Sequence, residues 1–135
     1  MTAPAPSTHP LVQTWLHRHP EAAAALRDDG RLTLSLADRA RMHLQPLPGG
    51  ALLMEGRIAA LPPAGRTRAE RIDTLLRGGA ARMATHAQAV AIDAEAETFV
   101  LQQTLDDGLS PVAFEQAVED FMRALVFWKS LEAGR

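Results

Sequence analysis

The chain has 135 residues, with 14 lysines and arginines against 16 aspartates and glutamates, five histidines and no cysteine. This length suits one domain with an ordinary core, and the nearly balanced charge gives no general attraction to nucleic acid or to an anionic membrane. The lack of cysteine excludes disulfide scaffolds, thiolate metal sites and cysteine nucleophiles, and it fits a reducing cytoplasm.

The N-terminal region predicts a short flexible segment followed by a helix. Residues 1–8 are small and rich in proline, so we expect a flexible N-terminus and a single domain over residues 9–135. This start lacks the basic and apolar regions of a signal peptide, and no apolar run in the chain reaches the ~20 residues of a membrane span. A first helix is expected from residues 8–10, with Val12, Trp15 and Leu16 on one apolar stripe.

Pro20 ends or kinks this helix, and residues 21–26 fit one or two further helical turns. Residues 31–61 then predict three short strands. Leu32 and Leu34 alternate with polar residues, and so do Met42 and Leu44 in the second strand and the apolar residues of 52–58 in the third. Turns are expected at Asp38-Arg39 and over residues 46–50.

A second helix is predicted from about Thr67 to about Thr85. Thr67 and Glu70 fit a capping box, and Ile72, Leu75, Leu76 and Met83 form its apolar side. Gly78-Gly79 conflicts with this helix, because glycine costs roughly 1 kcal/mol relative to alanine in a helix. Either the helix breaks there or a neighbouring segment approaches closely.

Two more strands and a long helix complete the pattern. The strands are expected over residues 87–93 and 98–105, and Ser110 with Pro111 predicts the start of a helix that runs to about Leu131. The expected fold is therefore α+β, with a twisted antiparallel sheet of five strands and three helices in the order α-β-β-β-α-β-β-α.

The histidines and aspartates do not form a recognisable catalytic or metal-binding set. His17 and His19 point to different sides of a helix, so a metal site is not expected. Asp28-Asp29 and Asp106-Asp107 each precede a glycine, as turn residues do, which favours turns over paired catalytic carboxylates.

Nucleophile and cofactor motifs are also missing. No Gly-x-Ser-x-Gly elbow surrounds Ser35 or Ser110, and the glycine pairs lack the lysine and hydroxyl residue of a phosphate loop. Trp15 and Trp128 lie in apolar stripes, which favours core or interface positions over a cofactor box. The arginines are scattered among acids without a basic stretch. We therefore predict no catalytic residues, no cofactor, no metal and no nucleic-acid partner.

Apolar residues remain without a chemical role. If the first and last helices cover one face of the sheet, the other face is left partly bare, with Leu53, Val100 and Val90 or its neighbours on it. Such a surface marks a protein–protein interface. The alternative is that the second helix covers this face within the monomer, and the pattern alone does not decide between the two.

Over about residues 9–132, the chain resembles the class I chaperones of bacterial type III secretion, the Tir-chaperone or CesT-like family. The resemblance rests on the order of elements and on several weak motifs taken together. These are Asp29-Gly30-Arg31 with Leu34 and Asp38, the run from Leu52 to Ile58 ending in Leu61-Pro62, the passage from Leu75 through Asp93, Phe99-Val100-Leu101, and Leu109-Ser110-Pro111 with Phe114, Phe121 and Trp128.

The resemblance implies a non-enzymatic, cytoplasmic bacterial homodimer that binds the N-terminal segment of a secreted effector and keeps it non-globular. It implies no nucleotide and no membrane partner. The residues expected at the dimer interface are Ile72, Leu75, Leu76 and Val90. Those expected to bind the effector are Val12, Leu16, Leu34, Leu44, Leu53 and Met54, although a plain core role fits Leu34, Leu44 and Met54 at least as well.

Two other functions stay open at this point. One is a small enzyme of unrecognised type that uses aspartate and histidine from separate turns, which requires polar groups to converge in one pocket. The other is a regulatory adaptor that only dimerises.

Overall fold

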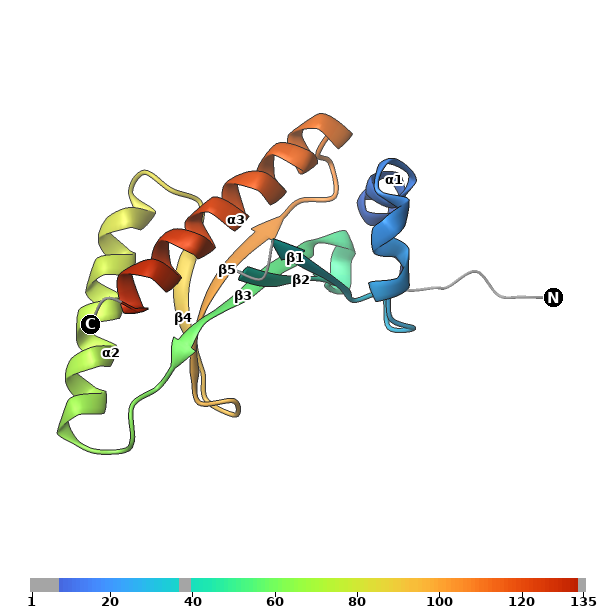
Figure 1. Ribbon diagram of the computed structural model, residues 1–135. Helices are drawn as coiled ribbons and strands as arrows, with labels where there is room; N and C mark the ends of the chain where they lie inside the picture. Colours follow the sequence, from blue (N-terminus) through green and yellow to red (C-terminus); the bar gives the residue numbers. More distant parts are fainter. Residues whose placement is uncertain (1–7, 37–39, 134–135) are drawn as a thin grey trace.

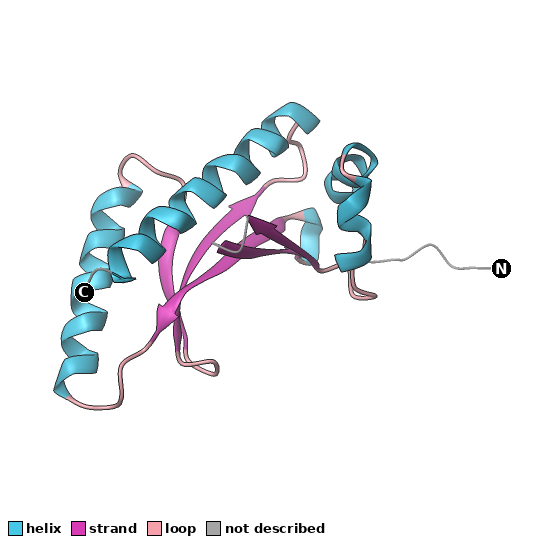
Figure 2. Ribbon diagram, viewed as in Figure 1, coloured by secondary structure: helices cyan, strands magenta, loops and turns pink. Residues whose placement is uncertain are grey.

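The computed structural model describes residues 8–36 and 40–133, and it confirms the predicted fold class and element order (Figures 1 and 2). The elements are α1 (Pro10–Arg18), β1 (Leu32–Leu36), β2 (Ala40–Pro46), β3 (Leu52–Ala60), α2 (Arg66–Met83), β4 (Ala89–Asp93), β5 (Thr98–Leu105) and α3 (Pro111–Ala133), with 3-10 helices at Pro20–Ala25 and Pro48–Gly50. The predicted turn at Asp38-Arg39 and all but Thr8 of the predicted flexible N-terminus lie outside the described residues.

The sheet is antiparallel throughout, with the strand order β1-β2-β3-β5-β4. β1 and β4 are therefore its two edge strands. Seen from the side, α1 lies near the β1 end of the sheet and α2 stands beside β4 at the other end, while α3 runs between them (Figure 1).

The three helices lie on the same face of the sheet. Strand register places Leu34, Met42, Gly56, Leu101 and Val90 in one row across that face. Leu125 of α3 approaches Gly56 so closely that a Cβ there would lie 2.5 Å from Leu125 Cδ2, and α2 approaches Val90 in the same way through Gly79. The core between this face and the helices includes Val12 of α1.

The opposite face carries no helix in the described part of the chain, which decides between the two sequence-based alternatives. That face is bare, but it is mainly polar, because its central row is Thr33, His43, Glu55, Gln102 and Ala89. Leu53 and Val100 share its parity as expected, and of Val90 and its neighbours it is Ala89 and Ala91 that lie on it. Val90 pairs with Leu101 on the helix-covered face.

α3 supplies the largest part of the core. Ser110 caps its start as predicted, since the Ser110 hydroxyl accepts a hydrogen bond from the Ala113 amide at 3.1 Å. Its buried stripe then follows helical spacing, so the helix is held along its whole length. The buried apolar residues of the stripe are Phe114, Val118, Phe121, Met122, Leu125 and Trp128.

α2 is continuous through Gly78-Gly79, so the conflict noted in the sequence is resolved by close packing. A Cβ on Gly79 would lie 2.9 Å from both Cβ and Cγ2 of Val90, while a Cβ on Gly78 would make an ordinary 3.6 Å contact with Trp128. The predicted capping box was wrong. The helix begins one residue earlier than expected, after Gly65, which makes no side-chain capping bond.

We predict opposite effects for alanine at the two glycines. Gly78→Ala should raise the free energy of unfolding by up to about 1 kcal/mol, because it removes the helical cost of glycine without a clash. Gly79→Ala should lower it by about 1 kcal/mol or more, because the side chain of Val90 is stiff at χ1 and cannot move aside. Urea unfolding at one protein concentration would measure both, and equal stabilities would contradict the packing described above.

Candidate functional site

A groove of about 710 Å³ opens between the N-terminal helices, edge strand β1 and α3. Its lining combines apolar and polar side chains, a composition that suits an amphipathic peptide ligand. The apolar lining residues are Trp15, Ala22, Ala25, Leu34, Val118 and Met122, and the polar ones are His19, Glu21, Thr33, Ser35, Glu119 and Arg123.

The N-terminal end of α1 is fixed by His9. Its Nδ1 accepts a hydrogen bond from the Leu11 amide at 3.1 Å, and its Nε2–H donates to the carbonyl oxygen of Gly50 at 2.7 Å. The histidine is buried; its bond to Leu11 lies away from solvent, and its bond to Gly50 is partly so. His9 thus caps the helix and ties it to the turn before β3, a structural role.

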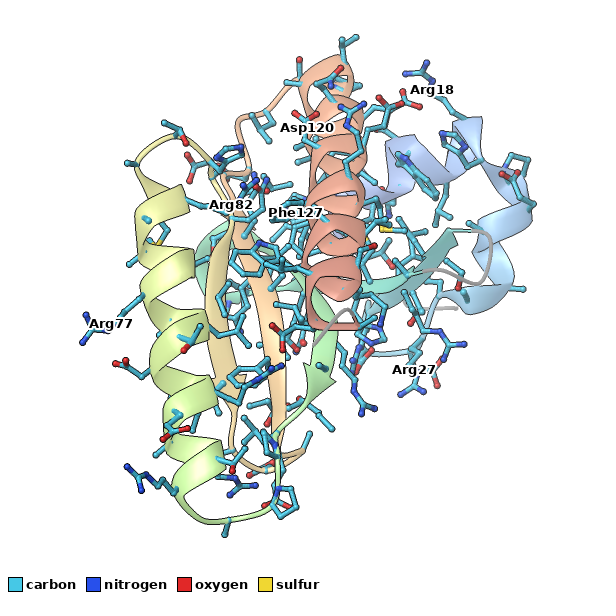
Figure 3. All side chains as sticks on the ribbon, turned by 60° about the vertical axis from the view of Figure 1, so that its left-hand side comes forward. Arg18, Arg27, Arg77, Arg82, Asp120 and Phe127 are labelled. Atoms are coloured by element: carbon cyan, nitrogen blue, oxygen red, sulfur yellow. The ribbon has the colours of Figure 1, made fainter. Side chains whose placement is uncertain are left out.

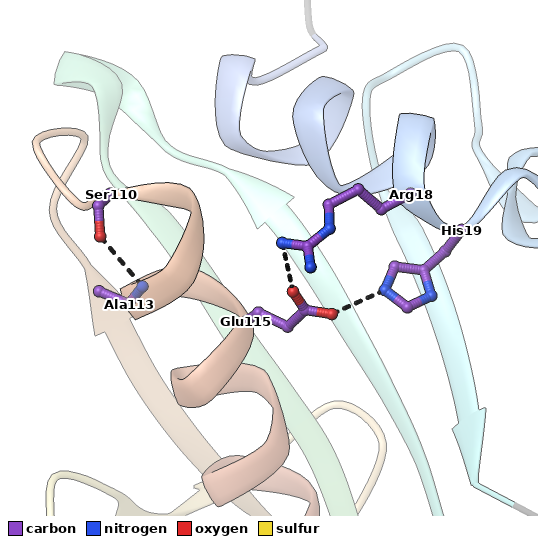
Figure 4. Close-up of polar contacts among 5 residues, drawn as sticks. All are labelled: Arg18, His19, Ser110, Ala113 and Glu115. Atoms are coloured by element: carbon purple, nitrogen blue, oxygen red, sulfur yellow. Dashed lines mark hydrogen bonds and ion pairs between the residues drawn. The ribbon is translucent and has the colours of Figure 1, made fainter.

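The C-terminal end of α1 is fixed by Glu115 of α3, shown in Figure 4. Arg18 Nη1 lies 2.7 Å from Glu115 Oε2, and His19 Nε2 lies 3.0 Å from Glu115 Oε1. The His19 ring also stacks on Trp15 with centroids 4.1 Å apart. We call Arg18, His19 and Glu115 the α1–α3 latch, because this ionic contact sets the spacing of the two groove walls.

One wall of the groove is an open sheet edge. On the outer side of β1, the described residues place a bridge only at Leu32, which pairs with Leu26. Leu34 and Ser35 follow it and line the groove. An extended segment lying there has both apolar contacts and main-chain hydrogen-bonding groups within reach.

A second cavity of about 570 Å³ lies between the end of α2 and α3. The Arg82 guanidinium stands 4.3 Å from the centroid of the Phe127 ring, and both point into the space between these helices (Figure 3). Hydrogen bonds from Arg123 and Gln116 lower the pKa of Asp120 on the rim. The cation–π contact of Arg82 with Phe127 thus joins α2 to α3, whereas the bonds of Asp120 lie within α3.

The outer face of α2 carries exposed apolar residues. Leu76 is 38% exposed and Met83 is 56% exposed, and their spacing of seven places them on one side of the helix together with exposed Ala80. Edge strand β4 runs beside this helix. We call Leu76, Ala80 and Met83 the α2 stripe.

The structure places the residues predicted to bind an effector in three settings. Val12, Leu44 and Met54 are fully buried in the core. Leu34 lines the groove, Leu16 is half-buried on α1 outside it, and Leu53 is half-buried on the bare face of the sheet.

The residues predicted for a dimer interface are also divided. Leu76 is exposed, Leu75 is buried in the core, Ile72 is half-buried, and Val90 is half-buried against Gly79. The groove residues that the sequence did not single out are mainly Ala22, Ala25 and Met122, because alanine in a short helix carries no periodic signal.

Metal clusters and membrane spans are both absent from the described residues. Within residues 8–36 and 40–133, no three histidine or acidic side chains are grouped to hold a metal ion. In the same part of the chain, none of the helices combines the length and apolar character of a membrane span.

Solved structures of similar fold come from two-protein complexes. A chain of the ExsC–ExsE complex aligns with a TM-score of 0.70 at 18% identity, over 90% of this chain and 90% of the other. A chain of the HopA1–SchA chaperone–effector complex aligns with a TM-score of 0.67 at 13% identity, over 89% and 94%. A chain of the ExoU–SpcU complex from the type III secretion system of Pseudomonas aeruginosa aligns with a TM-score of 0.61 at 21% identity, over 88% and 92%. These likenesses concern the fold.

Sequence comparison identifies the family. No curated protein matches the chain. The model of the Tir chaperone protein (CesT) family matches residues 22–129, which is most of the chain and includes every strand, α2 and most of α3. The match confirms the resemblance seen in the sequence and assigns the chain to chaperones rather than to enzymes. The chain belongs to the Tir chaperone protein (CesT) family.

Proposed function

We propose that this protein is a cytoplasmic chaperone of a bacterial type III secretion system. In this proposal it acts as a homodimer, binds the N-terminal segment of a secreted effector and keeps that segment non-globular. The observation that carries the proposal is the apolar groove beside the open edge of β1. The family assignment and the chaperone–effector complexes of similar fold support it.

The groove suits an unfolded client better than a folded one. Its lining joins apolar side chains of α1 and α3 to the open edge of β1, and an extended segment can use both the apolar contacts and the free main-chain groups of that edge. A disordered segment loses conformational entropy when it is ordered, and burial of its apolar side chains against Trp15, Leu34 and Met122 offsets this loss. Of the residues proposed for effector contact, Leu34 is therefore central, while Val12, Leu44 and Met54 support the groove from the core.

The proposed dimer uses the α2 stripe and the neighbouring edge of β4. Exposed apolar side chains at Leu76 and Met83 favour burial against a second copy. Strand β4 is an edge with few charges, a type of edge that proteins normally cover. Within this proposal, Leu76 makes the direct contact and Ile72, Leu75 and Val90 hold the helix in place from within the monomer.

We predict that Ala22→Glu weakens client binding at least about tenfold, a loss of about 1.4 kcal/mol. The added carboxylate enters the groove without disturbing the buried core. The test is a calorimetric titration of the protein with the N-terminal segment of the effector whose gene lies beside that of this protein. Ala24→Glu is the matched control, since Ala24 is exposed in the same short helix and does not line the groove.

Two results of this experiment would count against the proposal. The first is equal binding of the segment by the Ala22→Glu and Ala24→Glu variants, which would place the client elsewhere. The second is the failure of every neighbouring secreted protein to bind the unaltered chain.

We predict that Leu76→Glu converts the dimer to a monomer, because it places a charge in an apolar interface. Light scattering should give a mass of about twice 14.6 kDa for the unaltered chain and about 14.6 kDa for the variant. Val112→Glu is the control, since Val112 is 74% exposed on α3 and lies outside the proposed interface. A Leu76→Glu variant that stays dimeric would remove α2 from the interface.

A further inference from the structure

The bare face of the sheet gathers arginines that are far apart in the sequence. Arg41 shares the parity of His43 on β2, and Arg57 shares the parity of Glu55 on β3, so both lie on the face without helices. Arg31 precedes Thr33 by two residues and has the same parity. Arg27 joins them from the preceding turn, where its amide bonds to the carbonyl of Arg31 at 2.8 Å. We call these four residues the arginine face.

The arginine face is not held by the ion pairs that hold other arginines of the molecule. Within the described part of the chain, none of its four guanidinium groups forms an ion pair, although most other arginines do. The nearest acid on the sheet, Glu55, accepts a 2.6 Å hydrogen bond from Gln102 instead. In the turn, the Asp29 carboxylate accepts a hydrogen bond from the main-chain amide of Arg31.

This arrangement costs stability. Arg41 precedes Met42 and Arg57 follows Gly56, so the antiparallel pairing of Met42 with Gly56 brings the two arginines side by side on adjacent strands. Like charges in this position repel each other. Arg31 Nε is buried without a hydrogen-bond partner among the described residues, which leaves a donor unsatisfied. Both costs fall when an external anion lies among the arginines.

His43, at the centre of this face, responds to the same positive field. Burial is the largest cause that lowers its pKa, and Arg31, Arg41 and Arg27 lower it further, while Glu55 opposes them. Thr33 Oγ1 lies 2.9 Å from His43 Nδ1. The imidazole therefore stays neutral near pH 7, and any anion bound beside it must raise its pKa.

We propose that the arginine face binds an extended acidic segment of the client polypeptide. This inference rests on the proposed chaperone function. It specifies further that the part of the client that crosses the bare face is negatively charged. A carboxylate can accept two hydrogen bonds from the forked guanidinium group of arginine. In an extended peptide, side chains at alternate positions point to the same side, so acids at alternate positions would all point toward the sheet. Nucleic acid is disfavoured because the described part of this face presents no phenylalanine, tyrosine or tryptophan, and its one aromatic ring, that of His43, is partly buried.

The probe for this proposal is a labelled ten-residue peptide of alternating glutamate and threonine, with alternating glutamine and threonine as its uncharged counterpart. Anisotropy should show binding of the acidic peptide that weakens as salt is added. The double variant Arg41→Gln/Arg57→Gln should bind it at least tenfold more weakly. The control, Arg66→Gln/Arg77→Gln, removes the same charge from exposed α2 pairs with Glu70 and Asp73 and should bind it as the unaltered chain does.

Two further measurements separate binding from a structural role. Thermal unfolding of Arg41→Gln/Arg57→Gln should occur at the same or a higher temperature than in the unaltered chain, because the substitutions remove a repulsion. In NMR titrations, the acidic peptide should raise the pKa of His43. A lower unfolding temperature with unchanged peptide affinity would assign the arginines to stability and overturn the proposal.

The remaining outcomes are also decisive. Absence of binding, equal binding by the two double variants or equal binding of the glutamine peptide would overturn the proposal. Tighter binding of a ten-nucleotide oligouridylate than of the acidic peptide would replace it with a nucleic-acid site. Failure here leaves the proposed function intact when the effector segment still binds and Ala22→Glu still weakens it, because none of the four arginines lines the groove.

Discussion

The close contact between α3 and the sheet is the constraint on which the rest of the structure depends. Because Gly56 lacks a Cβ, Leu125 packs directly against the backbone of β3. The buried stripe of α3 therefore packs closely against the sheet along its whole length. With α3 in this position, α1 meets it through Glu115 and α2 meets it through Trp128 and Gly78. A larger residue at 56 would lift α3 and loosen both neighbours together.

This placement gives the two ends and the two faces of the sheet different characters. The β1 end holds the apolar groove, and the β4 end holds the α2 stripe. One face is filled by helices, and the other is bare and polar. If two copies join through the β4 ends, the two grooves lie at the far ends of the pair, and one unfolded client must cross the outer surfaces to reach both.

Much of the fold could be predicted because its signals are local. Alternation over residues 31–61 predicted β1 to β3, and Ser110-Pro111 with the stripe after it predicted α3 closely. The face covered by each helix could not be predicted, since it depends on close approaches at Gly56 and Gly79 between segments far apart in the chain. The groove was anticipated only at Leu34, because its other walls come from alanines and from α3. The arginine face was missed for a related reason. Its four arginines are separated in the sequence, and only the pairing of the strands shows that they lie on one face.

The latch between Arg18, His19 and Glu115 gives the groove a property that its apolar lining alone does not have. The contact is electrostatic and partly open to water, with the Arg18 side chain 54% exposed, so dissolved ions screen it, whereas the buried anchor at His9 is shielded from them. Helix α1 is thus fixed at its N-terminal end by the hydrogen bonds of His9 and at its C-terminal end by an ionic contact. A rise in ionic strength therefore weakens the contact at the C-terminal end of α1, beside the groove, more than the hydrogen bonds of His9 at its other end.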